Sequence, residues 1–235
     1  MFDFVRDNKN QSTMLVGEIE TLQELEAAIQ SAMNHQIDRL DLSFSTRYES
    51  VIPNSIGDII SLKQLTFYSK SCNYHCIKHI HSSIGNLSNL KSLQVSDAYY
   101  GLESLPESIG CLKNLEELYI SSCSQLKELP SSIGKLKNLK RLELLGSMYP
   151  LSSFKKLPDT IGQLTSLEDL IIDSTIIRSL PETLGNLVNL NYLRITNNLN
   201  LHQLPSSIGN LHQLTDMMLE EGFLTSLPES IGELK

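Results

Sequence analysis

The stretch LPSSIGKLKNLKRLEL, residues 129–144, decides the fold because the chain repeats it about eight times. Its core element is Pro-x-[Ser/Thr]-[Ile/Leu]-Gly, and the copies lie 23 to 28 residues apart. The repeated glycines are Gly57, Gly85, Gly110, Gly134, Gly162, Gly185, Gly209 and Gly232. One copy carries His81 where the others carry proline. Repetition at this period is typical of a solenoid, in which each unit packs on its neighbours.

An LxxLxL segment follows every repeated glycine but the last, as in Leu115, Leu118 and Ile120. The last two apolar residues are two apart, so both lie on one face of a short strand. Parallel stacking of such strands buries the leucines in a core that no single repeat can form. We therefore expect Leu118, Leu142 and Leu193 to be buried.

The proline and the glycine predict a short helical or 3-10 segment on the opposite side of each repeat. Proline has a fixed φ and no N–H, which suits the first turn of such a segment. Glycine suits its C-cap, where φ is often positive. Strands on one side and wider segments on the other predict a curved stack.

At these residues the chain resembles the leucine-rich repeat family, in the LPxxIGxLxxLxxLxL variety of plant intracellular and bacterial proteins. The resemblance covers roughly residues 37–235. It implies an α/β horseshoe with a parallel concave β-sheet, short helical or 3-10 convex segments, and binding as the usual activity. The family's asparagine after the strand is kept at Asn198, while Cys123 and Thr175 occupy two equivalent positions.

Residues 1–36 are predicted to form an N-terminal cap, and residues 37–235 one continuous array of about eight repeats. The segment TLQELEAAIQSAMNHQ predicts a helix with a capping box from Thr21 and Glu24. Its apolar face would carry Leu22, Leu25, Ala28, Ile29, Ala32 and Met33. We expect this helix to cover the first repeat, with a partner-binding helix as the alternative. The preceding run MLVGEI would be a short edge strand.

Composition disfavours several classes of partner. The net charge of −8 argues against nucleic acid and anionic membranes, whose binders usually carry a basic patch. No run of 18 apolar residues is present, and the first 12 residues lack the pattern of a secretory signal. We expect a cytoplasmic protein with reduced thiols, and leave export as an effector open. The chain stops at SIGELK before another LxL strand, so we also leave open a fragment or a partner-covered end.

Alternation along each strand predicts the residues of the concave face. The first column is Arg39, Gln64, Ser92, Glu117, Arg141, Asp169, Tyr192 and Asp216. The middle column is Asp41, Thr66, Gln94, Tyr119, Glu143, Ile171, Arg194 and Met218. The third column is Ser43, Tyr68, Ser96, Ser121, Leu145, Asp173, Thr196 and Glu220.

Seven of these 24 residues are acidic and three are basic, so the face is net negative and predicts a protein partner with a basic or mixed surface. Tyr119, Leu145 and Ile171 are expected to form an exposed apolar patch. Tyrosine and arginine are common anchors of interfaces. The predicted partner-binding residues are Tyr68, Glu117, Tyr119, Arg141, Glu143, Leu145, Asp169, Ile171, Asp173, Tyr192 and Arg194. The alternative is a solvated sheet face whose apolar members pack on each other.

A cluster of possible metal ligands occurs in an insertion: Cys72, His75, Cys76, His79 and His81. The segment shows no clear helical period that would bring them together, so we expect no metal. Cys111 should be partly exposed and Cys123 buried, and neither has a partner typical of a nucleophile. No GxSxG, HExxH or phosphate-binding glycine motif is present. We predict a non-enzymatic protein without a cofactor.

Together these patterns predict protein recognition through the concave face. Two long loops could contribute, or could be loop drift: YSKSCNYHCIKHIH and LLGSMYPLSSFKK. Two alternatives stay open. The chain could be the recognition domain of a larger receptor or bacterial effector with a separate catalytic or signalling domain. It could also be a structural protein that self-associates through its C-terminal end.

Overall fold

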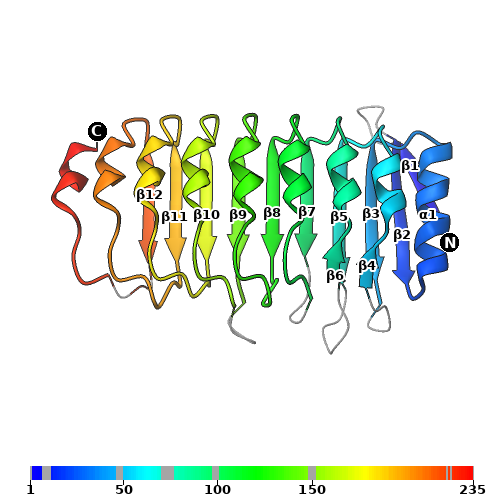
Figure 1. Cartoon of the computed structure of the whole chain (residues 1–235), viewed down its shortest axis with the longest axis horizontal. Helices are drawn as coiled ribbons and strands as arrows, with labels where there is room; N and C mark the ends of the chain where they lie inside the picture. Colours follow the sequence, from blue (N-terminus) through cyan, green and yellow to red (C-terminus); the bar gives the residue numbers. More distant parts are fainter. Residues whose placement is uncertain are drawn as a thin grey trace.

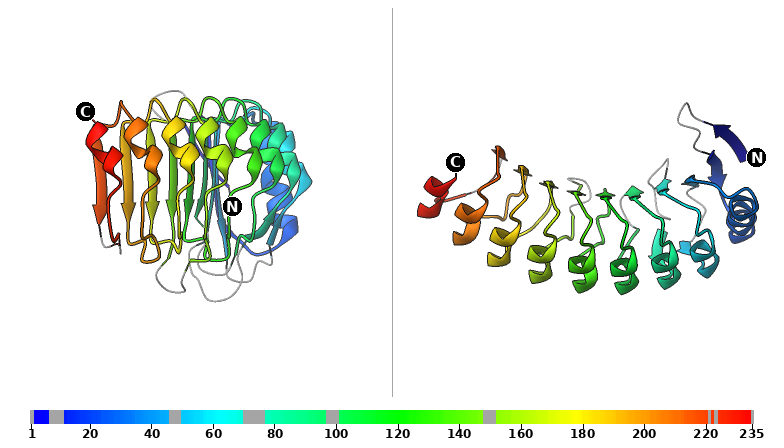
Figure 2. Two further views of the ribbon diagram at one scale, coloured as in Figure 1. Left: turned by 60° about the vertical axis from the view of Figure 1, so that its left-hand side comes forward. Right: turned by 90° about the horizontal axis from the view of Figure 1, so that it is seen from above.

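The repeats form one curved stack with strands on one side and 3-10 helices on the other. The computed structural model describes residues 2–6, 12–45, 50–69, 77–96, 101–147, 152–220, 222 and 224–234. Seen from above, the 3-10 helices follow the outside of an arc and the strands the inside (Figure 2). The predicted horseshoe, with a concave sheet, is confirmed.

Ten strands form the concave sheet, in the order β1-β2-β3-β5-β7-β8-β9-β10-β11-β12 (Figure 1). All neighbouring pairs are parallel except β1 and β2. The first five are β1 Phe2–Arg6, β2 Ser12–Ile19, β3 Arg39–Phe44, β5 Gln64–Ser69 and β7 Ser92–Ser96. The others are β8 Glu117–Ser121, β9 Arg141–Leu145, β10 Asp169–Asp173, β11 Tyr192–Thr196 and β12 Asp216–Glu220. A second, two-stranded sheet pairs β4 Ser50–Ile52 with β6 Ile77–Ile80.

A five-residue 3-10 helix begins directly after each motif proline, or after His81 in the repeat without proline. Together, these segments form the convex side. These helices are η1 Asn54–Asp58, η2 Ser82–Asn86, η3 Glu107–Cys111, η4 Ser131–Lys135, η5 Asp159–Gln163, η6 Glu182–Asn186, η7 Ser206–Asn210 and η8 Glu229–Glu233. The leucines between the two sides form one continuous core, in which Leu118, Leu142 and Leu193 are fully buried as predicted. Stacking therefore buries the apolar faces that single repeats cannot bury alone.

The N-terminal segment adds two strands and a helix to the same stack. Helix α1, Leu22–Asn34, begins at the predicted capping box of Thr21 and Glu24. Leu25, Ala28, Ile29 and Ala32 are buried, whereas Leu22 in the first turn is exposed. The run MLVGEI was expected at the sheet edge, but it belongs to β2, which lies between β1 and β3.

Proline caps each 3-10 helix of the convex side except η2, in agreement with the sequence. At η2 the cap is His81, whose Nδ1 accepts a hydrogen bond of 3.1 Å from the Ser83 N–H. An imidazole acceptor thus satisfies an N–H group at the start of the helix. This contact gives His81 a structural role in the repeat that lacks proline.

The repeated glycines allow close packing, and the expected positive φ is absent. None of the glycines in the described ranges has a positive φ, and each motif glycine lies inside its 3-10 helix. A Cβ on Gly110 would lie 2.5 Å from the Ser132 carbonyl oxygen of the next repeat and 2.7 Å from its Cβ. The motif keeps glycine because neighbouring convex backbones approach this closely.

The Ser or Thr two residues before the glycine joins neighbouring repeats at Ser83, Thr183 and Ser230, whereas the equivalent hydroxyls of Ser108, Ser132, Thr160 and Ser207 have no hydrogen-bond partner among the described residues. The Ser83 hydroxyl donates to the Asn54 carbonyl at 2.6 Å, and the Thr183 hydroxyl donates to the Asp159 carbonyl at 2.7 Å. Each bond reaches back to the preceding 3-10 helix. A bonded hydroxyl and a glycine without Cβ therefore both favour close packing of neighbouring 3-10 helices.

Glutamate side chains form a second link between convex segments, in the opposite direction. Glu182 in η6 accepts hydrogen bonds from the backbone N–H groups of Ser206 at 3.1 Å and Ser207 at 2.9 Å. Glu107 makes equivalent bonds to Ser131 and Ser132. These bonds, first among them the one from the Ser207 N–H, hold the pKa of the Glu182 carboxyl below its ordinary value.

Buried hydrogen bonds also join the strand ends at the asparagine position. The Asn198 amide donates to the carbonyls of Ile172 at 2.9 Å and Thr196 at 2.7 Å, and its oxygen accepts from the Thr175 N–H at 3.2 Å. Cys123 holds the equivalent position and donates from Sγ to the Ser121 carbonyl at 3.4 Å. Both side chains therefore bond the backbone near the ends of the strands.

Gly110→Ala should destabilise the protein by roughly 1–3 kcal/mol, because the new methyl group overlaps the Ser132 backbone. Gly232→Ala is a matched control at the same motif position, where nothing lies within 4 Å of the added Cβ. It should change the free energy of unfolding by less than about 0.5 kcal/mol. Urea denaturation of both variants measures the difference, and equal effects would contradict the close-approach role.

Glu182→Gln should lower stability at pH 7 by roughly 0.5 kcal/mol, a small effect because the carboxylate is exposed. Its folded-state pKa is lowered, so its stabilisation is present above the ordinary value of 4.5 and is lost as pH falls through the lowered value. The stability gap between wild type and variant should therefore shrink on acidification. Urea titrations at several pH values measure the gap. Glu229→Gln, at the same motif position, is the control and should change stability less.

Candidate functional site

The candidate site is the concave surface of strands β8 to β11, where the structure aligns the predicted columns. Glu117, Arg141, Asp169 and Tyr192 are register partners across the four strands. Tyr119, Glu143, Ile171 and Arg194 form the next row in the same way. Ser121, Leu145, Asp173 and Thr196 form the third. Ten of the eleven predicted contact residues therefore lie on four adjacent strands, and Tyr68 lies apart on β5.

Arg141 is the centre of the charge network on this surface. Its Nε lies 2.6 Å from Glu143 on the same strand, and its guanidinium lies 2.7 Å from Asp169 on β10. The side chain of Glu143 is only 15% exposed and that of Arg141 38%. Partial burial opposes the charge on Arg141, but the hydrogen bond to Glu143 and the nearby carboxylates raise its pKa above the ordinary value. The guanidinium is held in one position as a cation.

A second network lies at the C-terminal ends of the strands. Arg194 contacts Asp173 at 3.3 Å across β10 and β11, and its Nε donates to the Thr196 hydroxyl at 3.2 Å. Asn197 and Ser174 also donate to the Asp173 carboxylate, at 2.9 and 3.0 Å. Both arginines are thus oriented by acidic residues of the same face.

Sequence reasoning missed Asn197 and Ser174 because they follow the strands. Both have positive φ, at 56° and 54°, as has Ser122 after β8. This left-handed turn directs the chain out of the strand, and asparagine and serine side chains there reach the strand ends. The signal in the sequence that could have identified Ser174 and Asn197 is their position, since each directly follows the last residue of a strand.

Tyr119 lies next to Arg141 and Glu143 and is half-buried. Burial, followed by the charge of Glu117, raises the pKa of its hydroxyl to about 12. The hydroxyl therefore stays protonated and neutral at physiological pH. Tyr68 and Tyr192 are also half-buried, so each of the three rings keeps some exposed surface.

Ile171 is not part of an exposed patch. Only 6% of the residue is accessible, although it lies in the middle column between Glu143 and Arg194. Long charged neighbours can cover an aliphatic side chain with their own stems, which period-2 alternation does not reveal. Leu145 remains half-buried, so the predicted apolar patch is reduced to Tyr119 and Leu145.

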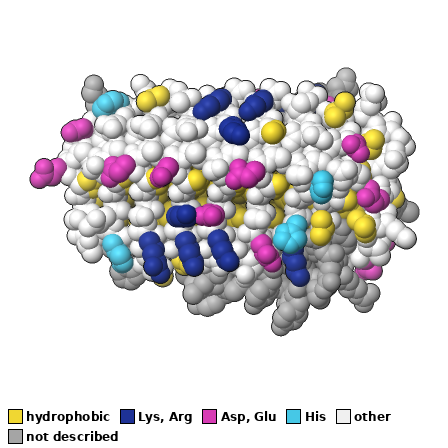
Figure 3. Space-filling model, viewed as in Figure 1, with side chains coloured by type: hydrophobic (Ala, Val, Ile, Leu, Met, Phe, Trp, Pro, Cys, Tyr) yellow, Lys and Arg dark blue, Asp and Glu magenta, His cyan; other side chains and the backbone are white. Residues whose placement is uncertain are grey.

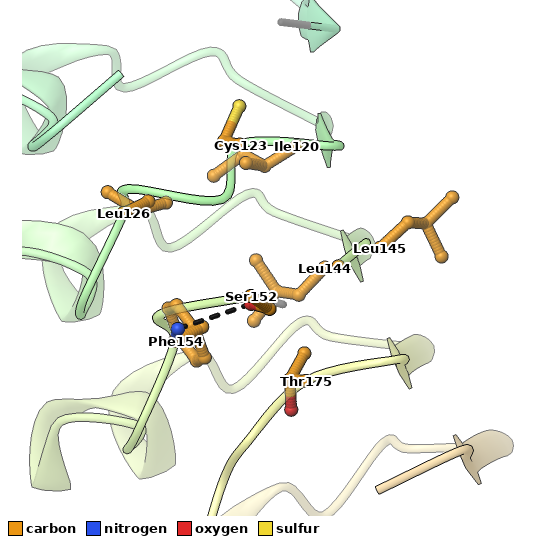
Figure 4. A pocket seen from close by; sticks show the side chains of 9 residues that line it. Ile120, Cys123, Leu126, Leu144, Leu145, Ser152, Phe154 and Thr175 are labelled. Carbon is orange, nitrogen blue, oxygen red and sulfur yellow. Dashed lines mark hydrogen bonds between the residues drawn. The ribbon is translucent and has the colours of Figure 1, made fainter. Parts of the chain in front are cut away.

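A small cavity lies behind this surface, between the ends of β8 and β9 and the segment that carries Phe154 (Figure 4). Its volume is about 10 Å³, room for about one water molecule. Ile120, Cys123, Leu126 and Leu144 line it, while Leu145 points away from Phe154 (Figure 4). The cavity is too small for a ligand.

The histidine and cysteine side chains show no convergent arrangement in the described ranges. His79 lies on strand β6, His81 caps η2, and Cys72, His75 and Cys76 lie outside the described residues. Cys111 is exposed and Cys123 is buried, as expected. No group of three or more potential metal ligands occurs among the described residues. None of the described helices is both long and apolar enough to span a bilayer.

Comparisons with known proteins agree with the fold. A family model described as a leucine-rich repeat region matches residues 70–179. The leucine-rich repeat domain of the type III effector XopL is similar in structure, with a TM-score of 0.67 and 20% sequence identity, over 91% of this chain and 79% of that one. A TDR receptor is similar over 93% of this chain and 40% of that one, with a TM-score of 0.56 and 22% identity. A search of curated proteins found no match.

Proteins with this architecture generally act in protein–protein interaction. The register of the repeats, the parallel solenoid and the matching family model agree on one assignment. Residues 70–179 match the leucine-rich repeat family model, and the described solenoid has the leucine-rich repeat fold.

Proposed function

We propose that the chain is a non-enzymatic module that binds a protein partner through the concave surface of β8 to β11. The observation that carries this proposal is Arg141, which is fixed between Glu143 and Asp169 beside Tyr119. An anchor whose side chain is already ordered loses less entropy on binding. Tyrosine and arginine are also among the residue types most enriched at positions that dominate interface energetics.

Charge on this surface favours a basic or mixed partner. Strands β8 to β11 carry four acidic residues in the columns, Glu117, Glu143, Asp169 and Asp173, against Arg141 and Arg194. Each arginine is already paired, and among these four described carboxylates Glu117 is the one outside an ion pair. A lysine or arginine of the partner would be attracted to this end of the site, which aids orientation and association rate more than affinity.

A second candidate uses the same surface in a larger protein. The similar domain of XopL belongs to an effector, and the TDR receptor chain is longer than the region matched here. These likenesses extend to fold alone, so the role of recognition domain in a receptor or effector is a proposal that they motivate. Both candidates place binding on the concave surface, in a cytoplasmic setting that suits the free thiols of Cys111 and Cys123.

The double variant Tyr119→Ala/Tyr192→Ala should weaken binding of the partner more than tenfold, because buried aromatic anchors contribute about 2 kcal/mol or more at interfaces. The partner is first captured from the source cells with wild type and variant in parallel, and its affinity is then measured by calorimetry. Unchanged affinity would contradict the proposed site.

The matched control is Ile60→Ala/Val188→Ala, which truncates two exposed residues away from the concave columns. It should bind as wild type does. Thermal unfolding of both variants ensures that a loss of binding is not a loss of fold. Equal loss in the two double variants would also contradict the concave site.

A further inference from the structure

Three basic side chains, Lys127, Lys155 and Arg178, form a row on the outer surface of the solenoid. Each precedes the motif proline of its repeat by three residues. The Lys155 N–H donates to the Lys127 carbonyl at 3.0 Å, and the Arg178 N–H to the Lys155 carbonyl at 3.4 Å. Backbones joined in this way lie about 4.8 Å apart. All three side chains are exposed, and Figure 3 shows basic side chains side by side on this face.

The row is a local group of positive side chains in a chain of net charge −8. Within the described part of the chain, none of the three residues is in an ion pair. Lys156, next to Lys155, is by contrast paired with Glu128 at 3.0 Å. Adjacent like charges repel one another, and within the described residues no carboxylate paired with any of the three side chains offsets this repulsion. An anionic ligand would remove this repulsion.

An open hollow of about 380 Å³ lies beside the row. The half-buried Pro130 and Pro158 supply its accessible apolar lining above the buried Leu105 and Leu129, and Glu107, Glu128 and Lys156 are among its polar residues. The hollow lies next to the row, because Lys127 is followed in the chain by Glu128 and Leu129, which both line the hollow. Apolar surface and unpaired cations are therefore available to the same ligand.

We propose that the row and the hollow bind an acidic amphipathic helix of a partner protein. Residues at i and i+4 on a helix have Cβ atoms about 5–6 Å apart, close to the spacing of the row. In an extended peptide, successive residues on the same face are about 6.6 Å apart, so their spacing does not match that of the row. Glutamates on one helix stripe would face Lys127, Lys155 and Arg178, and leucines on the neighbouring stripe would enter the hollow.

The surroundings of the row favour this occupant over nucleic acid or a membrane. In the preceding repeat, Glu103 occupies the equivalent position, and its N–H donates to the Lys78 carbonyl. The row of basic side chains therefore ends at this repeat. The exposed acidic residues Glu107, Asp159 and Glu182 lie on the convex helices of the same side. A long polyanion would meet all of these carboxylates, whereas a short helix would meet only Glu107, which lines the hollow on the side of the leucine stripe.

The test measures binding of a fluorescent 18-residue helical peptide with glutamates on one stripe and leucines on the next. Wild type should bind it in a salt-sensitive manner. Lys127→Gln/Lys155→Gln/Arg178→Gln should weaken binding by about tenfold or more, since three charge contacts are lost. The matched control is Lys113→Gln/Lys135→Gln/Lys137→Gln, which removes the same charge elsewhere on the convex side and should change binding less than about threefold.

Several outcomes would overturn the proposal. These are no binding by wild type, equal loss in the two triple variants, or equal binding of a peptide with the same residues scrambled. Tighter, row-dependent binding of polyphosphate or phosphatidylserine vesicles would identify a different class of ligand. The Tyr119→Ala/Tyr192→Ala variant should bind the peptide as wild type does. A loss there would place the peptide on the concave surface, so failure of this inference and failure of the concave site are distinguishable.

Discussion

The structure depends on the fact that one repeat cannot bury its own leucines. A strand of five residues and a 3-10 helix of five residues have too little surface to enclose Leu118 or Leu142, yet both are fully buried between neighbouring repeats. Every other feature has to preserve this stacking. The parallel hydrogen bonds set the spacing on the concave side, and the Asn198 amide with its bonds to Ile172 and Thr196 holds the strand ends in place.

On the convex side, steric contact limits how closely neighbouring repeats can approach, and glycine is required at the motif position because of this limit. The Gly110 backbone approaches Ser132 so closely that a methyl group does not fit. Serine and threonine hydroxyls and the carboxylates of Glu107 and Glu182 then bridge the same gap. The concave surface is rigid because both sides of the stack are tied, and its arginines can be held by carboxylates on neighbouring strands.

Sequence periodicity predicted the parts of the fold that depend on side-chain spacing alone. The register of the three columns, the buried leucines, the proline caps and the Thr21–Glu24 capping box occur as expected. The predicted exposure of the columns is wrong at Asp41, Ser43, Ile171 and Thr196, which are buried. Features that depend on how neighbours fill space were not predictable in this way. Ile171 is buried because of residues on the adjacent strands, and the motif glycine is selected by the next repeat's backbone. The Lys127 row likewise appears only when consecutive repeats are in register.

The links between convex segments are directional. Hydroxyls such as that of Ser83 reach the preceding 3-10 helix, whereas carboxylates such as that of Glu182 reach the following one. The unit that contains η6 has both links, with the Thr183 hydroxyl directed backward and the Glu182 carboxylate directed forward. The motif glycines from Gly57 to Gly209 share the same close approach to the backbone of the next repeat. A duplicated unit inserted between two others would meet compatible neighbours on both sides, so such a gene can lengthen or shorten by whole units. The length of the binding surface can then change during evolution without a new type of interface.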